Sequence, residues 1–136
     1  MSRLYLDACT IIYLIEAANP FHKAVLARLA QHGKDPRAQI VTSQLSRLEC
    51  RTRPLRDKDA GLLAKYDEFF SAQRLLLAEV STAVIDRATE LRAVHGFKTP
   101  DAIHLATAID DGADVFLTGD TTLQRCAKVK VEVVVP

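Results

Sequence analysis

The chain has 136 residues, 49% of them hydrophobic and 26% charged, and its 18 Lys and Arg against 17 Asp and Glu give a net charge of +1. This composition excludes disordered and low-complexity classes, and the length suits a single domain over residues 1–136. No apolar run approaches the ~20 residues of a membrane span, and the cysteines Cys9, Cys50 and Cys126 are widely spaced, so we expect a soluble, cytoplasmic domain with free thiols and no membrane partner.

The first half of the chain alternates short apolar runs with helical patterns. Leu4–Leu6 is typical of a buried strand that ends at Asp7, and Thr10 is expected to cap the helix that follows. Ser43 is expected to cap a later helix that Pro54 ends. The other predicted elements are a helix from Phe21 to near Gly33, a strand at Gln39–Thr42, a helix within Asp57–Ser71, and Leu75–Leu77 as a strand or a helix end.

The second half gives clearer boundaries. The predicted elements are a helix at Ser81–His95 closed by Gly96, a helix that begins with Thr99 as N-cap and Pro100 as its first residue and ends at Gly112, a strand at Val115–Thr118, a short helix near Leu123, and a strand at Val131–Val135. Strands that alternate with helices and are almost continuously apolar predict an α/β fold. We expect a mostly parallel sheet of about five strands with helices on both faces.

Four acidic residues fall where such a fold binds ligands, beyond the carboxyl ends of its strands. Asp7 ends the first strand, and Asp120 follows the Val115–Thr118 strand after a glycine. Asp101 lies in the first turn of its helix, and Glu49 lies about two turns into the helix that leaves the second strand. We therefore expect these carboxylates to meet at one edge of the sheet.

Each acid also has an ordinary structural interpretation. Asp7 can cap a helix, Asp101 can complement a helix dipole, Asp120 can occupy a turn and Glu49 can be an exposed helix residue. Together, however, four converging carboxylates repel one another unless a cation lies among them. A site made only of oxygen ligands favours Mg²⁺ or Mn²⁺ over zinc.

Three segments, Leu6–Thr10, Thr99–Ala108 and Leu117–Asp120, together with Glu49 resemble the PIN domain, and more narrowly a VapC-type toxin of a toxin–antitoxin pair. The resemblance covers essentially the whole chain. It implies a three-layer α/β/α domain and a metal-dependent endoribonuclease. The family's acidic quartet then falls on Asp7, Glu49, Asp101 and Asp120.

On this interpretation one or two ions, Mg²⁺ or Mn²⁺, are held by the quartet, and water hydrolyses an RNA phosphodiester to leave 5′-phosphate and 3′-hydroxyl ends. Asp7 and Asp101 are expected to bind the primary ion, Asp120 a second ion or ordered waters, and Glu49 the attacking water. Two hydroxyls are expected to support the ligands from behind, those of Thr10 and Thr118. The resemblance also implies a VapB-type antitoxin as partner, in a homodimer or an antitoxin-bound hetero-oligomer.

Several features have two open interpretations. The basic side chains of Arg47, Arg51, Arg53, Arg56 and Lys58 are either a phosphate-binding rim or a solvated helix end. His104 is either an acid–base group near Asp101 or, more often for such a position, a packed helix histidine with a backbone partner. Cys9 and Cys50 lie near the proposed ligands, but no histidine spacing supports a nucleophile or soft-metal site.

The main alternative to an enzyme is a PIN-like module that binds RNA or protein without cleavage. A phosphoaspartyl phosphatase is disfavoured because it needs a second aspartate at the position of Cys9. A receiver domain is disfavoured because no acidic pair follows the first strand.

Overall fold

Five short strands form one sheet in the order β3-β2-β1-β4-β5 in the computed structural model, which describes residues 2–136. Every neighbouring pair is parallel, so the mostly parallel sheet predicted above is confirmed. The central strand β1 aligns Leu4 with Ile40 on one side and with Val115 on the other. The strands are β1 (Arg3–Leu6), β2 (Gln39–Ser43), β3 (Leu75–Ala78), β4 (Val115–Thr118) and β5 (Lys130–Val133).

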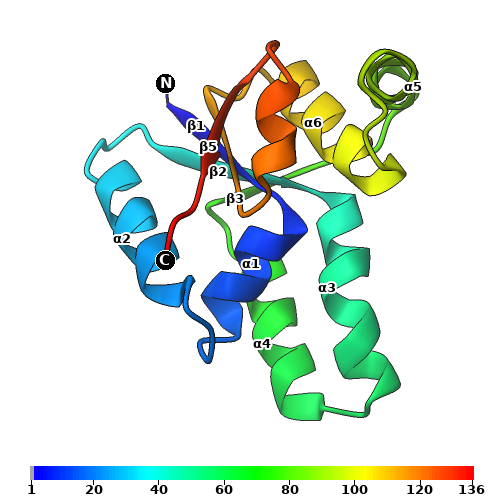
Figure 1. The fold of residues 1–136 in the computed structure, drawn as a ribbon. Coiled ribbons are helices and arrows are strands. Elements are labelled where there is room, and N and C mark those ends of the chain that lie inside the picture. Colours follow the sequence, from blue (N-terminus) through cyan, green and yellow to red (C-terminus); the bar gives the residue numbers. More distant parts are fainter. Residues whose placement is uncertain (1) are drawn as a thin grey trace.

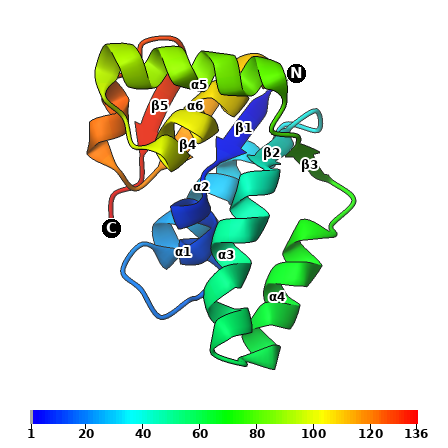
Figure 2. The same cartoon turned by 90° about the vertical axis from the view of Figure 1, so that its right-hand side faces the viewer.

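Helices cover both faces of this sheet, which gives the expected three layers (Figures 1 and 2). They are α1 (Ala8–Ile15), α2 (His22–His32), α3 (Gln44–Arg56), α4 (Ala60–Phe70), α5 (Thr82–His95), α6 (Thr99–Asp111) and the 3₁₀ helix η1 (Thr121–Arg125). Tyr5 and Phe116 point into the core under α5 and α6, whereas Leu4, Leu6 and Leu117 point into the core under α1, α2 and α4. Because both faces are buried, β1 is apolar at every one of its buried positions.

The pair α3 and α4 packs side by side and extends beyond the sheet (Figures 1 and 2). Ser43 begins α3 as predicted, with its Oγ accepting a hydrogen bond from the amide of Leu45 at 3.0 Å.

The segment Leu75–Leu77, left open by the sequence, is part of strand β3. Among residues 2–136, none of the helices combines the length and the apolar character that crossing a bilayer requires.

The expected cap of α1 is wrong by three residues. Thr10 lies inside the helix, and Asp7 is the N-cap, because its Oδ1 accepts a hydrogen bond from the Thr10 amide at 3.0 Å. A carboxylate at this position satisfies one of the amides that an α-helix leaves unpaired at its start. Asp7 thus ends β1 and begins α1 without an intervening loop.

Two other helix boundaries also differ from the prediction. Pro54 does not end its helix, since α3 continues to Arg56. The missing proline N–H costs one hydrogen bond near the helix end, and Asp57 N still donates to Arg53 O at 2.9 Å. Thr99 is the first residue of α6 instead of its N-cap, which is Lys98, because the Thr99 hydroxyl accepts a hydrogen bond from Arg92 and does not cap.

We predict that Gly112→Ala lowers the free energy of unfolding by about 1 kcal/mol, because Gly112 ends α6 with φ +78°, where a Cβ is strained. The matched control is Gly61→Ala in α4, where an added Cβ meets nothing closer than 3.9 Å. That change should raise stability by up to about 1 kcal/mol. Urea denaturation measures both, and equal effects of the two substitutions would contradict the backbone argument.

Candidate active site

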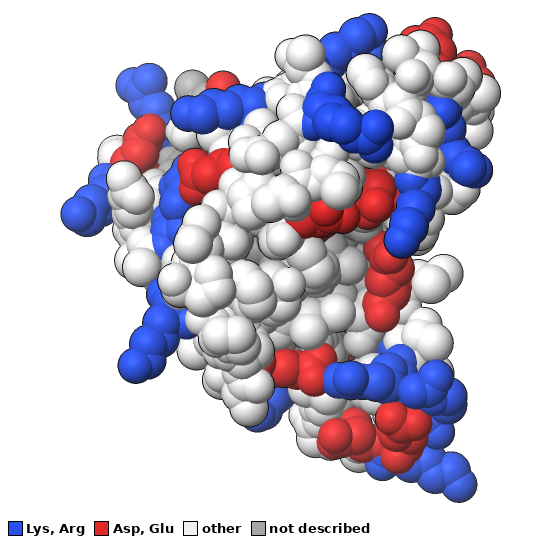
Figure 3. Space-filling view, viewed as in Figure 1, with Lys and Arg blue, Asp and Glu red and all other residues white. Residues whose placement is uncertain are grey.

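All four acids expected at the sheet edge line a single cavity of about 400 Å³. Asp7 comes from the β1–α1 junction, Glu49 from α3, Asp101 from the first turn of α6 and Asp120 from the start of η1. In Figure 3 acidic side chains gather at the middle of the face between the α5–α6 side and the α3–α4 side. The convergence predicted from the sequence is therefore present in the structure.

Asp7 is the most buried acid of the cavity, with 6% of its surface exposed. Its Oδ1 accepts hydrogen bonds from the amide and hydroxyl of Thr10, at 3.0 and 2.9 Å. Its Oδ2 accepts one from the Thr118 hydroxyl at 2.6 Å. The two threonines therefore lie behind Asp7 as expected. Asp7 both caps α1 and lines the cavity.

Asp101 and Asp120 face each other across the start of α6 and η1. The pKa of Asp101 is raised, first by burial and then by the negative charges of Asp120 and Asp7. Asp120 also stabilises the turn in which it lies, because its Oδ1 accepts hydrogen bonds from the Thr122 amide at 2.9 Å and from the Thr122 hydroxyl at 2.8 Å. The shifted pKa reflects burial first and, after it, repulsion from the neighbouring carboxylates.

Glu49 is held by a buried histidine for which the sequence favoured ordinary helix packing over an acid–base role near Asp101. His104 is 2% exposed and has two side-chain partners instead of a backbone one. Its Nε2 lies 2.6 Å from Glu49 Oε1, and its Nδ1 lies 2.7 Å from the hydroxyl of Tyr5. The spacing of His104 from Asp101 on one helix was the only sequence signal, and nothing local to the sequence points to Tyr5.

The direction of these bonds follows from what each group can donate. A carboxylate only accepts, so His104 Nε2 carries the proton shared with Glu49. Burial and then the charge of Asp7 raise the pKa of Tyr5 well above its usual value, so its hydroxyl stays protonated and donates to Nδ1. The chain Tyr5–His104–Glu49 thus runs from the core to the cavity with each donor matched to an acceptor.

Cys9, Tyr13 and Gly119 also line the cavity, and none was predicted as a site residue. A Cβ on Gly119 would lie 2.8 Å from ring atoms of Tyr13, so glycine is needed for the tyrosine to pack over this turn. Burial and the charge of Asp7 raise the pKa of the Cys9 thiol to about 12. The protonated thiol donates to Asp7 Oδ1 at 3.1 Å, which agrees with the prediction that Cys9 is not a nucleophile.

The four arginines proposed as a phosphate-binding rim do not line this cavity. Each has a partner elsewhere on the surface. Arg51 Nε lies 2.9 Å from Asp67 Oδ1, within ion-pair distance although without hydrogen-bond geometry, and Arg47 donates to Gln44 Oε1 at 3.0 Å. Arg53 pairs with Glu16, and Arg56 pairs with the neighbouring Asp57 at 3.1 Å.

The donor set of the cavity fits a hard divalent cation. Its acidic side chains offer carboxylate oxygens only, and no Lys or Arg of residues 2–136 lines it to neutralise them. As the side chains stand, no three His, Cys, Asp or Glu groups within that range are gathered closely enough to hold an ion. Asp7, Glu49 and Asp120 each use at least one carboxylate oxygen in a hydrogen bond within the protein.

The sequence matches the model of the PIN domain family over residues 4–129. No curated protein is similar enough in sequence to be matched. Solved structures do match, among them VapBC2 from Rickettsia felis, crystallised with a DNA fragment of its promoter. It is 19% identical, with a TM-score of 0.80 over 97% of this chain and 98% of that one.

Two further structures share the fold at similarly low identity. VapC20 from Mycobacterium tuberculosis, described as a sarcin–ricin loop cleaving toxin, has 15% identity and a TM-score of 0.75 over 95% of this chain and 98% of that one. VapBC-1 from nontypeable Haemophilus influenzae has 16% identity and a TM-score of 0.76 over 96% of this chain and 97% of that one. At these identities the likeness establishes the fold.

We predict that Asp101→Asn raises thermal stability in EDTA, because it removes one of four repelling charges. The gain should be at most about 1 kcal/mol, since solvent screens a half-exposed carboxylate, and should shrink in high salt. The matched control is Asp86→Asn, an exposed aspartate in α5, which should change little. A loss of more than about 1 kcal/mol in the Asp101 variant would favour its helix-dipole role instead.

We also predict that Tyr5→Phe lowers the free energy of unfolding by about 1–3 kcal/mol, because it leaves the buried Nδ1 of His104 without its donor. Nitrogen chemical shifts of the wild-type imidazole should report a proton on Nε2 and none on Nδ1. A proton found on Nδ1 in the wild type would show that the direction assigned to this hydrogen-bond chain is wrong.

Proposed function

The chain belongs to the PIN domain family, and from this premise we propose that it is a divalent-metal-dependent endoribonuclease acting as the toxin of a VapC-type toxin–antitoxin pair. The observation that carries the proposal is the cavity lined by Asp7, Glu49, Asp101 and Asp120. Carboxylates gathered without a cationic side chain are costly for the protein to keep ionised. A bound Mg²⁺ or Mn²⁺ removes that cost and is the reason such a cavity is useful.

The position and hydrogen bonds of each residue in the cavity suggest its role. Asp7 and Asp101 would hold the primary ion, and Asp120 a second ion or its ordered waters. Thr10 and Thr118 fix the Asp7 carboxylate from behind, so that it does not have to be ordered when substrate arrives. When bound, the ion would lower the pKa of a water molecule and neutralise negative charge at the scissile phosphate.

Glu49 is assigned to the attacking water. Its Oε1 is engaged by His104, which leaves the other carboxylate oxygen to accept a proton from a water in the cavity. His104 is a positioning residue in this scheme, because it is 2% exposed and acts through Glu49. Attack by water on the phosphorus, with cleavage of the P–O3′ bond and departure of the 3′ oxygen as a hydroxyl, gives 5′-phosphate and 3′-hydroxyl products.

The biological setting is proposed from the fold. The VapBC structures named above share the fold over nearly the whole chain. By analogy we assign this chain a VapB-type antitoxin partner, a cytoplasmic location, one domain over residues 1–136 and a homodimeric or antitoxin-bound hetero-oligomeric state. Expression of the chain alone should then arrest growth, and co-expression of a cognate antitoxin should relieve the arrest.

The direct test is cleavage of structured RNA by the purified chain. We expect hydrolysis in Mg²⁺ or Mn²⁺ and none in EDTA. The cleavage rate should fall by at least about 100-fold on Asp7→Asn, because the carboxamide removes a ligand charge while keeping the shape of the carboxylate. Products are scored for 5′-phosphate ends by ligation. Asp86→Asn, exposed on α5, is the matched control and should cut like the wild type.

RNA that is bound but left intact under every metal condition would support the alternative, a PIN-like binding module without cleavage. Cleavage that persists in EDTA, or in Asp7→Asn at the wild-type rate, would reject the metal-dependent mechanism. Products with 2′,3′-cyclic phosphate ends would reject water as the attacking group.

A further inference from the structure

An acidic cavity cannot attract RNA by its own charge, so the protein needs cations elsewhere to bind the strand. Three basic residues of α3, Arg51, Arg53 and Arg56, are a poor source, because each is paired with an acid. Their positive charge is largely cancelled before any phosphate arrives. Basic side chains that lack such partners are better candidates.

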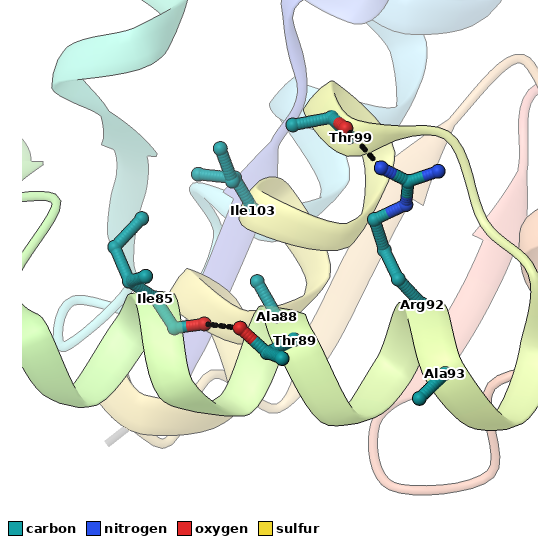
Figure 4. A pocket seen from close by; sticks show the side chains of 7 residues that line it. All are labelled: Ile85, Ala88, Thr89, Arg92, Ala93, Thr99 and Ile103. Carbon is teal, nitrogen blue, oxygen red and sulfur yellow. Dashed lines mark hydrogen bonds between the residues drawn. The ribbon is translucent and has the colours of Figure 1, made fainter.

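Three such cations converge on the loop that joins α5 to α6. Arg92, near the end of α5, donates from Nε to the carbonyl of Phe97 at 3.0 Å and from Nη1 to the hydroxyl of Thr99 at 2.7 Å (Figure 4). Arg125, at the end of η1, stacks over the Phe97 ring at 4.8 Å and donates to the His95 carbonyl at 3.0 Å. Lys98 extends from the same loop into solvent.

The partners of these cations are neutral groups, which hold the side chains in place without cancelling their charge. Among residues 2–136, no ion pair includes Arg92, Lys98 or Arg125. All three side chains are exposed. The arginines are also partly immobilised by their carbonyl and ring contacts, which lowers the entropy cost of binding a phosphate.

These cations are close in the chain to two acids of the cavity. Lys98 is the N-cap residue of α6, so it is about one helical turn from Asp101. Arg125 ends the η1 turn that Asp120 caps and whose first residue, Thr121, lines the cavity. In Figure 3 basic side chains border the acidic group on its upper side, over η1 and the start of α6, whereas those at the lower tip alternate with acidic ones.

We propose that Arg92, Lys98 and Arg125 form the surface that binds the phosphates of the RNA strand next to the cleaved bond. This inference rests on the proposed nuclease function and assigns its substrate-binding side. The strand would cross from the α5–α6 loop into the cavity, with the scissile phosphate at Asp101 and Asp120 and the adjacent phosphates on the three cations. Arg51, Arg53 and Arg56 would then not contribute to RNA affinity.

Two variants with the same loss of charge separate the two surfaces. One carries Arg92→Gln, Lys98→Gln and Arg125→Gln, and its matched control carries Arg51→Gln, Arg53→Gln and Arg56→Gln. Binding of a fluorescein-labelled single-stranded RNA is measured by anisotropy in EDTA, as a function of salt. For the first variant we expect RNA binding to be weaker by about tenfold or more. The slope of the logarithm of the binding constant against the logarithm of the salt concentration should be smaller in magnitude by roughly two, because each phosphate contact to a single strand contributes ~0.7 to that slope.

The control variant should bind within about twofold of the wild type. In Mg²⁺, KM for cleavage should rise in the first variant while kcat stays near the wild-type value, since these side chains do not touch the reacting atoms. If circular dichroism shows that the Arg92, Lys98 and Arg125 variant is poorly folded, Lys98→Gln alone should still weaken RNA binding. Arg125→Lys should keep most of the wild-type RNA affinity.

Equal weakening by both triple variants, or greater weakening by the α3 variant, would overturn the assignment while leaving the nuclease proposal intact, because the wild type still cuts. A fall in kcat with unchanged KM would also overturn it. A wild type that neither binds nor cuts RNA would overturn the inference together with the function on which it rests.

Discussion

The mutual repulsion of four carboxylates is the interaction on which the rest of this structure depends. Asp7, Glu49, Asp101 and Asp120 share one cavity of about 400 Å³, where burial and then the charges of the other acids raise the pKa of Asp101. The protein offsets this cost with hydrogen bonds from Thr10, Thr118 and Thr122 instead of with a lysine or arginine. Neutral donors of this kind stabilise the carboxylates and still leave the charge available to a cation.

The parallel sheet brings these groups together because its strands end at the same edge. Asp7 and Asp120 follow the neighbouring strands β1 and β4, so their positions are fixed by strand pairing. Glu49 is different, since it stands on α3, which extends beyond the sheet. Its contact with His104 ties it to α6, and the bond from His104 to Tyr5 ties both to the centre of β1.

Basic side chains on the surrounding surface differ in whether their partners are acidic or neutral. Three basic side chains on α3 are paired with acids at the end of α1, in α4 and in the α3–α4 turn, so they stabilise the projecting helices. The cations around the α5–α6 loop are held by carbonyls, a hydroxyl and an aromatic ring, which orient a guanidinium but do not neutralise it. Net charge, near zero for the chain, conceals this difference.

The sequence by itself determined the α/β class, the parallel sheet and the edge at which Asp7, Asp101 and Asp120 meet, because apolar strands followed by polar residues are local patterns. It misjudged Thr10, Pro54 and Thr99, where the outcome depends on which neighbour takes a hydrogen bond. Only the tertiary structure decided that His104 faces Glu49 and Tyr5, and that Arg51 and Arg53 are paired with Asp67 and Glu16. Contacts between residues far apart in the chain leave no periodic trace in it, so they are settled when the helices pack.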